Sequence, residues 1–350
     1  MKIWENNIRR VVPYVPGEQP QDEQMIKLNT NENPYPPSPA VAEAIVKLKA
    51  NKLRPYPDPK AEKLVAAIAN YHGLNENQVF VGVGSDDVLA LSFMTFFNSD
   101  KPILFPDITY SFYDVWADLF KIPYQTRALD DDFRIVKVDY ICDNGGVIFP
   151  NPNAPTGIAM GIDEVEEIIK INPDVIVIVD EAYVDFGVKS ALPLIEKYDN
   201  LLVVQTFSKS RSMAGLRIGY ACGDAKLIQY LNDVKYSFNS YTMNNPSIEL
   251  GVAALADESY FQDTLAKIIK TREWTKSELS KLGFSFGESK ANFIFATHKT
   301  CPAKTIYGAL RSEHIYVRYF NKPRIDNHLR ITIGTPEEME TLITTLKKIL

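Results

Sequence analysis

A continuous apolar segment that ends on an acidic residue constrains the fold of this chain more than any other feature. The segment DVIVIVD, residues 174–180, places five apolar residues in a row without alternating polar side chains. Such a run predicts a strand that is buried on both faces, which is typical of a parallel sheet covered by helices on both sides. The sequence therefore predicts an α/β fold.

Short apolar segments alternate with helical patterns around this strand, as expected for a mostly parallel or mixed sheet. Further strands are expected at residues 78–84, 102–106, 146–150, 201–207 and 215–223. Helices are expected at residues 40–50, 61–73, 85–97, 110–120 and 163–171. Gly73 is expected to cap the helix that ends there, because glycine readily adopts the left-handed conformation of a helix C-terminus.

The pattern changes near Pro246, which predicts a second, smaller unit. A long helix is expected over residues 264–283, and isolated strands over 293–297, 315–320 and 329–334. A last helix begins near Pro336, a residue suited to a first helical turn. We therefore expect a large α/β domain of residues 40–246, and a small α+β domain formed by residues 1–39 and 247–350.

Composition excludes several classes of function. The 350 residues include 38 basic and 44 acidic ones, which argues against non-specific nucleic-acid binding. Four scattered histidines predict no metal site, and three distant cysteines predict no disulfide framework. The chain shows no apolar stretch of signal-peptide or membrane-spanning length, so a cytoplasmic protein with no membrane partner is expected.

Polar side chains follow four of the expected strands. They lie in residues 82–87, 151–157, 180–183 and 206–209. Ligands of open α/β sheets bind beyond the carboxyl ends of the strands, so these segments are the candidates for a site. Each also has an ordinary structural interpretation, as a turn, a helix cap or a solvated residue.

The first of these segments suits an anion. Gly82 and Gly84 allow close approach of the backbone, and the helix that follows offers free N–H groups. Asp87 replaces the third glycine of a dinucleotide-binding fingerprint, which argues against a nicotinamide-dependent oxidoreductase. The alternative is a plain turn in which Ser85 or Asp86 caps the helix.

The carboxylate and the amine at two strand ends suggest chemistry. Asp180 follows an apolar strand and needs a partner there, such as a cation or a protonated ring nitrogen, whereas Glu181 better fits a solvated acid. Lys209 becomes a nucleophile if burial destabilises its charge, and Ser208 and Arg217 are residue types that hold phosphate. A surface lysine is the alternative.

Two prolines bracket the asparagines of residues 151–157. They predict a rigid turn that presents side-chain amides, with a cis X-Pro bond as one option and a purely structural turn as the alternative. Together, a strand-end aspartate, a strand-end lysine, an arginine, a glycine-rich cradle and this turn are the parts needed to hold pyridoxal phosphate.

The order of these motifs carries a specific resemblance. The segments GSDD (84–87), NPNAPTG (151–157), DEAY (180–183), SKS to AGLRIG (208–219) and LRITIG (329–334) resemble the fold-type I aminotransferases. The segments LNTNENPYPPSP (28–39), RPYPDP (54–59) and VRYFNKPRIDNHLRITIGT (317–335) narrow the resemblance to the histidinol-phosphate aminotransferase family. The family's fold has a large domain, with a mostly parallel seven-stranded sheet covered on both faces, and a smaller α+β domain.

The resemblance implies pyridoxal 5′-phosphate as cofactor. Lys209 would bind it covalently and then move a proton as acid and base, Asp180 would pair with its ring nitrogen, and Tyr183 would bind its phenolic oxygen. The other implied cofactor contacts are Tyr110 on the ring, and Gly84, Ser85, Asp86, Ser208 and Arg217 at the phosphate. Tyr56 would reach the phosphate from a second copy, which implies a homodimer with shared active sites.

One position departs from the family pattern. The family has an asparagine directly before Pro-Thr-Gly, where it contacts the phenolic oxygen of the cofactor, whereas this chain has Ala154. Either Asn151 or Asn153 supplies the contact through a shift of the turn, or Tyr183 makes it alone. An asparagine is the preferred substitute.

The substrate residues are also implied by the resemblance. Arg318 and Arg330 would bind the substrate phosphate, and Arg330 would bind glutamate's α-carboxylate as well. Tyr14 and the segment 29–33, which includes Asn31, would close the pocket. The alternative for Arg318 is a solvated strand residue.

The expected reaction is a ping-pong amino transfer in histidine biosynthesis. It interconverts histidinol phosphate and 2-oxoglutarate with imidazole-acetol phosphate and glutamate. A broad aromatic aminotransferase and, less favoured, a threonine-phosphate decarboxylase remain as alternatives. A regulator without turnover is disfavoured, because it needs a DNA-binding domain for which we expect no room.

Overall fold

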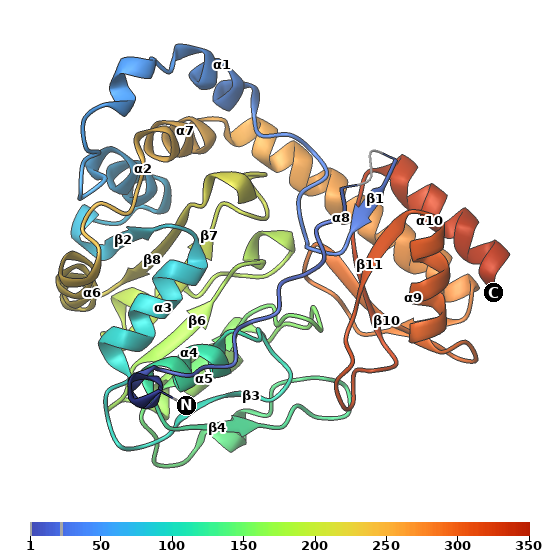
Figure 1. The fold of residues 1–350 in the computed structure, drawn as a ribbon, viewed down its shortest axis with the longest axis horizontal. Coiled ribbons are helices and arrows are strands. Elements are labelled where there is room, and N and C mark those ends of the chain that lie inside the picture. Colours follow the sequence, from blue (N-terminus) through green and yellow to red (C-terminus); the bar gives the residue numbers. More distant parts are fainter. Residues whose placement is uncertain (1, 22–23) are drawn as a thin grey trace.

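The computed structural model describes residues 2–21 and 24–350, which form two sheets with their covering helices (Figure 1). The large sheet has the strand order β2-β8-β7-β6-β5-β3-β4. Its strands are β2 (Val79–Gly82), β3 (Ile103–Pro106), β4 (Tyr124–Arg127), β5 (Val147–Pro150), β6 (Val177–Asp180), β7 (Leu201–Thr206) and β8 (Gly219–Gly223). Only the pairs that β8 makes with β2 and β7 are antiparallel. The predicted α/β fold with a mostly parallel seven-stranded sheet is confirmed.

Helices cover both faces of the large sheet because its strands are apolar on both sides. Val177 and Val179 of β6 belong to one hydrophobic cluster, and Ile178 belongs to the other. The first cluster contains residues of α2 (Glu62–His72), α5 (Ile162–Lys170) and α7 (Asn245–Ala256), and the second contains residues of α3 (Ser85–Phe96), α4 (Tyr113–Phe120) and α6 (Ala225–Phe238). Gly73 caps α2 with a φ of 69°, as expected.

The small sheet has the strand order β1-β11-β12-β10-β9. Its strands are β1 (Ile26–Leu28), β9 (Phe284–Phe286), β10 (Phe293–His298), β11 (Ile315–Tyr319) and β12 (Leu329–Thr332), and it packs with α8 (Glu258–Lys281), α9 (Ala303–Ser312) and α10 (Pro336–Ile349). Thr335 caps α10, and Pro336 stands in its first turn. The strand β1 pairs in parallel with β11, so residues from the start of the chain complete this sheet.

The connecting segments contain one more α-helix and several short 3₁₀ helices. The α-helix is α1 (Pro39–Lys47). The 3₁₀ helices are η1 (Ile3–Asn7), η2 (Ala50–Leu53), η3 (Glu76–Gln78), η4 (Lys137–Tyr140), η5 (Val184–Phe186), η6 (Leu192–Glu196) and η7 (Ala214–Leu216). Figure 1 shows the first residues beside α4 before the chain crosses to β1. There the Arg9 guanidinium donates to the carbonyl oxygen of Leu119 at 2.8 Å.

The chain leaves the hydrophobic packing of the large sheet and joins that of the small sheet after residue 246. The helix α7 lies against α1 and α2, and its residues Ile248 and Leu255 belong to a hydrophobic cluster of the large sheet. Phe261 of α8 belongs to the cluster of the small sheet. The hydrophobic clusters therefore divide between α7 and α8, rather than at the expected boundary of residues 246 and 247.

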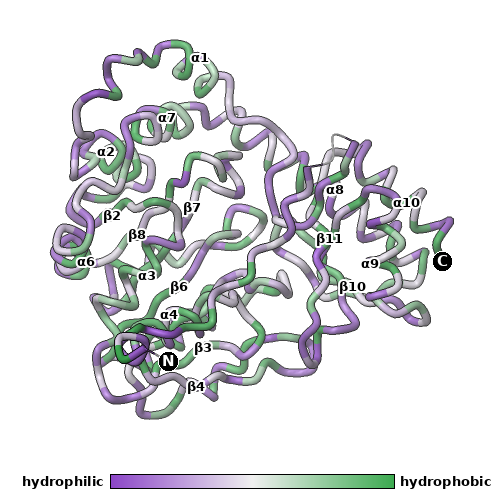
Figure 2. Tube along the Cα trace, viewed as in Figure 1, coloured by the Kyte–Doolittle hydropathy of each residue, from purple (hydrophilic) through white to green (hydrophobic). Residues whose placement is uncertain are grey.

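Apolar side chains are exposed on and after α1. Figure 2 colours much of α1, at the outer end of the molecule, as hydrophobic. Val46 is 86% exposed, and Ile45, Leu53 and Tyr56 are also exposed. Exposed apolar residues that cluster in this way mark contact surfaces more often than isolated ones do.

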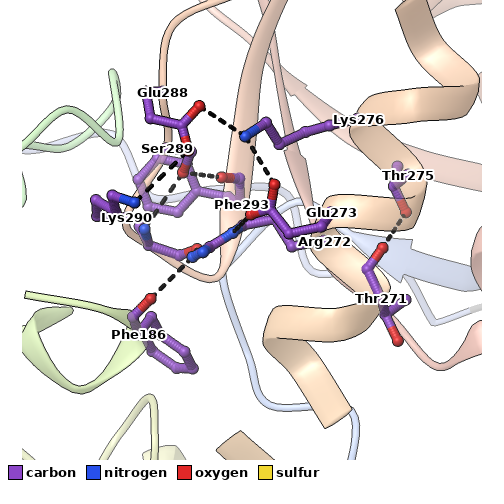
Figure 3. Close-up of polar contacts among 11 residues, drawn as sticks. Phe186, Thr271, Arg272, Glu273, Thr275, Lys276, Glu288, Ser289, Lys290 and Phe293 are labelled. Carbon is purple, nitrogen blue, oxygen red and sulfur yellow. Dashed lines mark hydrogen bonds and ion pairs between the residues drawn. The ribbon is translucent and has the colours of Figure 1, made fainter. Parts of the chain in front are cut away.

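A buried arginine joins the two halves of the chain (Figure 3). Arg272 of α8 is 3% exposed, and its guanidinium donates to the carbonyl oxygens of Phe186 in η5 and of Ala291 before β10, each at 2.9 Å. Its Nε donates to Glu273 at 2.9 Å, and Lys276 bonds the other oxygen of that carboxylate at 2.9 Å. Arg272 therefore anchors the small unit to the segment that directly follows β6.

We expect Arg272→Met to lower the free energy of unfolding by about 3 kcal/mol, because two buried carbonyl oxygens lose a charged donor. Urea unfolding followed by circular dichroism measures the change. Lys267→Met is the matched control on the same helix, since Lys267 makes an exposed ion pair with Asp263 and is expected to matter much less. Equal effects of the two substitutions would contradict this account of the junction.

Candidate active site

A cavity of about 270 Å³ lies where the carboxyl edge of the large sheet meets the small sheet and the N-terminal segment. Its lining includes eight of the residues predicted from the sequence: Tyr14, Asn31, Asp86, Tyr110, Tyr183, Lys209, Arg318 and Arg330. A larger cavity of about 780 Å³ is lined mainly by residues 130–138 and 285–288, and it includes Asn153. The smaller cavity is the candidate site, because the reactive side chains converge there.

Strand register explains this convergence. Pro150 of β5 pairs with Asp180 of β6, and Asp180 pairs with Val204 of β7, all in parallel. The three segments that follow these strands therefore leave the sheet at one edge. The amine of Lys209 reaches the cavity from this edge, where it donates to the carbonyl oxygen of Thr30 at 3.1 Å. It also lies 5.8 Å from the ring centroid of Tyr183, so Lys209 is no surface lysine.

Asp180 is buried at the base of this region, with 3% of its surface exposed. One carboxylate oxygen accepts a hydrogen bond from the Tyr113 hydroxyl at 2.8 Å, and the other accepts one from the Ala182 N–H at 3.2 Å. Burial raises the pKa of Asp180 to about 6 despite these donors. Sequence reasoning missed Tyr113, since nothing in its helix distinguishes a buried tyrosine that bonds a carboxylate from one that only packs.

Glu181 differs from its prediction as a solvated acid. It is 2% exposed, and it accepts hydrogen bonds from the Ser190 hydroxyl and the Ala191 N–H, each at 2.6 Å, and from the Gln205 amide at 2.8 Å. Burial raises the pKa of Glu181 to about 7. The strand-end position was correctly identified, but the turn that folds back over it, residues 190–191, could not be read from the sequence.

The segment before α3 forms a close backbone cradle. Gly84 has a φ of 85°, and a Cβ there would lie 2.4 Å from Nη2 of Arg217. A Cβ on Gly219 would lie 2.3 Å from the backbone nitrogen of Ser85. The first N–H groups of α3 start at Ser85, where a helix attracts anions. These residues fit a phosphate group.

Two side chains fix this cradle. The Asp86 carboxylate accepts a hydrogen bond from the Tyr110 hydroxyl at 2.6 Å and one from Arg217 at 3.1 Å. Burial and the neighbouring Asp86 raise the pKa of Tyr110 well above its ordinary value, so its hydroxyl stays a donor. Ser208 lies in the segment between β7 and Arg217, and its hydroxyl accepts a hydrogen bond from Thr206 at 3.0 Å.

The asparagines of residues 151–157 bond within their own surroundings. The Asn151 side chain bonds the N–H and the carbonyl of Met160 at 2.9 and 3.3 Å. The Asn153 amide donates to the carbonyl of Ile108 at 2.8 Å, and its oxygen accepts from Thr109 at 2.9 Å. Neither side chain lines the candidate cavity, whereas Ala154 does, so the structure gives no support to the preferred asparagine substitute.

A different asparagine reaches the tyrosine. The Asn31 amide donates to the Tyr183 hydroxyl at 2.8 Å. Asn31 has a φ of 56°, its N–H donates to Thr332 at 3.0 Å, and its carbonyl accepts from Asn292 at 3.0 Å. The small sheet thus holds Asn31 against Tyr183, a contact across 152 residues that sequence reasoning did not anticipate.

Two arginines lie side by side at the other end of the cavity. Arg318 of β11 pairs in register with Arg330 of β12. Arg330 donates to the carbonyl oxygen of Asn29 at 2.9 Å, and its buried Nε has no hydrogen-bond partner among the described residues. Burial, together with Arg318, lowers the pKa of Arg330. Adjacent guanidinium groups with spare donors suit a phosphate or carboxylate.

Tyr56 does not join the cavity. It is 80% exposed and packs on Tyr241 with a ring-centroid distance of 4.8 Å.

Across residues 2–21 and 24–350, no group of three or more His, Cys, Asp and Glu side chains is arranged to hold a metal ion.

The family model for class I and II aminotransferases matches residues 23–346. The chain belongs to this family. It is 54% identical to the histidinol-phosphate aminotransferase of Lactococcus lactis subsp. cremoris over 99% of this chain and 98% of that one. It is 52% identical to that of Clostridium botulinum over 100% and 99% of the two chains. The family resemblance expected from the motifs is confirmed.

Solved structures share the fold. Histidinol-phosphate aminotransferase from Sinorhizobium meliloti, in complex with pyridoxal-5′-phosphate, superimposes with a TM-score of 0.85 at 24% identity, covering 92% of this chain and 90% of that one. The L-threonine-O-3-phosphate decarboxylase from Porphyromonas gingivalis gives a TM-score of 0.78 at 20% identity, covering 93% and 99%. At these identities the likeness concerns the fold alone.

We expect Gly219→Ala to weaken binding of pyridoxal 5′-phosphate about tenfold or more, because the added methyl group displaces the backbone at Gly84 and Ser85. Fluorescence titration of the cofactor-free protein measures the dissociation constant. Gly215→Ala is the matched control, since a Cβ there meets no atom within 4 Å. If Gly219→Ala binds like the unsubstituted protein, the cradle does not hold the phosphate.

Proposed function

We propose that this aminotransferase uses pyridoxal 5′-phosphate to interconvert histidinol phosphate and 2-oxoglutarate with imidazole-acetol phosphate and glutamate. The observation that carries the proposal is one cavity that holds the Lys209 amine and the paired guanidinium groups of Arg318 and Arg330. Relatives more than half identical over the whole chain bear the name histidinol-phosphate aminotransferase, which supports this substrate.

The donors in the cavity and next to it fit the cofactor. Asp180, Gly84, Ser85 and Arg217 lie outside the lining, and Arg217 bonds the lining residue Asp86. Bound pyridoxal phosphate supplies an electron sink that lets a proton leave the carbon bearing the amino group. We assign Asp180 to the ring nitrogen, and the cradle at Gly84, Ser85 and Arg217 to the phosphate. The buried Asp180 carboxylate suits a protonated nitrogen, since pairing with a cation offsets the cost of burying the charge.

We assign three residues to the end of the cavity where the proton is moved. We assign Lys209 as the acid and base that moves the proton, because its side-chain nitrogen reaches this end of the cavity. We assign the Tyr183 hydroxyl, which accepts a hydrogen bond from the Asn31 amide, to the phenolic oxygen of the cofactor. In this assignment Asn31 acts on the cofactor through Tyr183. No other asparagine is then needed to replace the one that the family has at position 154.

The arginine pair accounts for both substrates. A phosphate dianion can take hydrogen bonds from Arg318 and Arg330 together, and a carboxylate can take them from Arg330 alone. Aromatic side chains, including Tyr14, Phe112 and Phe320, line the same cavity and provide a surface for an imidazole ring.

We also propose a homodimer, in which Tyr56 serves the partner's active site. Tyr56 is exposed and lies outside the cavity of its own chain, in the same part of the sequence as the exposed apolar residues Ile45, Val46 and Leu53.

The cysteines of the chain are unpaired, which suits the reducing cytoplasm that we propose as its location. No helix among the described residues is both long and apolar enough to cross a membrane.

Steady-state kinetics on the purified protein test the substrate. We expect kcat/KM for histidinol phosphate to exceed that for phenylalanine and tyrosine by about 100-fold, each with 2-oxoglutarate, since neither amino acid offers a dianion to both arginines. Comparable values would favour the broad aromatic aminotransferase, whose support is the aromatic lining. Carbon dioxide release from threonine phosphate would favour the decarboxylase.

We expect Lys209→Ala to lower the rate of amino transfer by ~10⁴-fold or more, because the group that moves the proton is lost. The production of glutamate from 2-oxoglutarate and histidinol phosphate measures the rate. Lys189→Ala, which removes an exposed lysine that does not line the cavity, is the control and should leave the rate unchanged. Unchanged turnover in Lys209→Ala would refute the proposed function as a whole.

A further inference from the structure

The Asp180 carboxylate lacks a cationic partner in the structure. It makes no ion pair with any of the described residues, and its donors are the Tyr113 hydroxyl and the Ala182 N–H. The nearby Asp86 carboxylate disfavours the ionised form, as burial does. Burial and Asp86 therefore favour the protonated form of Asp180, and the Tyr113 hydroxyl, a neutral side-chain donor, opposes them.

Tyr113 is held firmly in position to make this contact. It begins α4 and is fully buried, with 0% of its surface exposed. Its ring packs edge to face against Phe105 at 5.8 Å and against Tyr110 at 5.8 Å, and it packs at a tilt against Phe93 at 6.1 Å between centroids. This aromatic cage fixes the direction of the hydroxyl, which bonds Asp180 at 2.8 Å.

The hydroxyl of Tyr113 also remains a donor. Burial and the neighbouring Asp180 raise the pKa of Tyr113 well above its ordinary value. A donor to the ionised form of a carboxylate stabilises that form. Neither Tyr113 nor Asp180 belongs to the lining of the candidate cavity, and the Tyr113 hydroxyl bonds Asp180 itself, so Tyr113 is placed to act through Asp180 rather than on a substrate.

We propose that Tyr113 is a positioning residue, which orients the Asp180 carboxylate and holds it ionised for the ring nitrogen of the cofactor. This inference rests on the proposed function and extends it to a residue that makes no contact with the cavity. Tyr113→Phe keeps the packed ring and deletes the hydroxyl, so a buried carboxylate loses its side-chain donor.

The test is a double-mutant cycle on the dissociation constant of pyridoxal 5′-phosphate. We expect Tyr113→Phe to raise this constant about tenfold, and to lower kcat while leaving KM for histidinol phosphate unchanged. In an Asp180→Asn background, the same substitution should change the dissociation constant by less than about twofold, because the carboxylate through which Tyr113 acts is gone.

Tyr140→Phe is the matched control. Tyr140 is also a buried tyrosine of the large unit, at 1% exposure, but its hydroxyl has no hydrogen-bond partner among the described residues. It should leave cofactor binding unchanged, and thermal unfolding of each cofactor-free variant shows whether the fold is intact. A full tenfold effect of Tyr113→Phe in the Asp180→Asn background, or an equal effect of Tyr140→Phe, would overturn the inference.

The outcomes separate this inference from the proposed function. If the unsubstituted protein binds pyridoxal 5′-phosphate and transfers amino groups, but Tyr113→Phe matches it in both dissociation constant and kcat, the positioning role alone is wrong. If the unsubstituted protein neither binds the cofactor nor transfers amino groups, the proposed function fails, and the positioning role fails with it.

Discussion

The register of β5, β6 and β7 determines where the chemistry of this chain takes place. Parallel pairing aligns Pro150, Asp180 and Val204, so the segments that follow these residues emerge together. The strands are apolar on both faces and buried, which leaves their carboxyl ends as the place where polar side chains meet a cavity. A shift of one residue in this register would turn Asp180 toward the opposite face of the sheet.

The small sheet completes the site from the other side. It places Arg318 and Arg330 next to each other on antiparallel strands, and through Thr332 and Asn292 it holds Asn31 against Tyr183. Arg272 ties this unit to η5, directly after Tyr183. The two halves of the chain therefore share one set of contacts around the cavity, and neither half contains the site alone.

Local patterns predicted much of the fold, because burial on both faces and helix caps leave short-range signals. The seven-stranded sheet was anticipated except for β4, whose residues 124–127 are partly exposed and mostly polar. The strands β1 and β9 have three residues each, too few to show a period. The helices α6 and α7 were not anticipated, and α7 joins the large unit through contacts with α1 and α2.

The site shows the same division between local and long-range information. The strand-end positions of Asp180 and Lys209 follow from local sequence. The orientation of the Asn151 and Asn153 amides, the burial of Glu181 and the Tyr113 hydroxyl depend on which distant backbone folds over them. The place that we propose for Tyr56, in the site of a second chain, depends on that chain, so neither one sequence nor one chain's contacts determine it.

The charges in the cavity and next to it explain why two anionic groups would be bound in different ways. Arg217 already has a carboxylate partner in Asp86, and the N-terminus of α3 adds N–H donors beside it. Arg318 and Arg330, by contrast, pair with no carboxylate among the described residues, although burial makes the charge of Arg330 costly. An anion that binds there relieves both the burial cost and the repulsion between the guanidinium groups.

This difference matches the demands of a cofactor and of substrates. A fixed cradle with its own counter-charge suits a phosphate that stays bound through many reaction cycles. A pair of arginines without a built-in partner suits anions that enter and leave, because the stabilisation depends on whichever anion is present. In the proposed reaction Arg330 binds both the phosphate and the carboxylate, so the same unpaired charge would act in both halves of the ping-pong exchange.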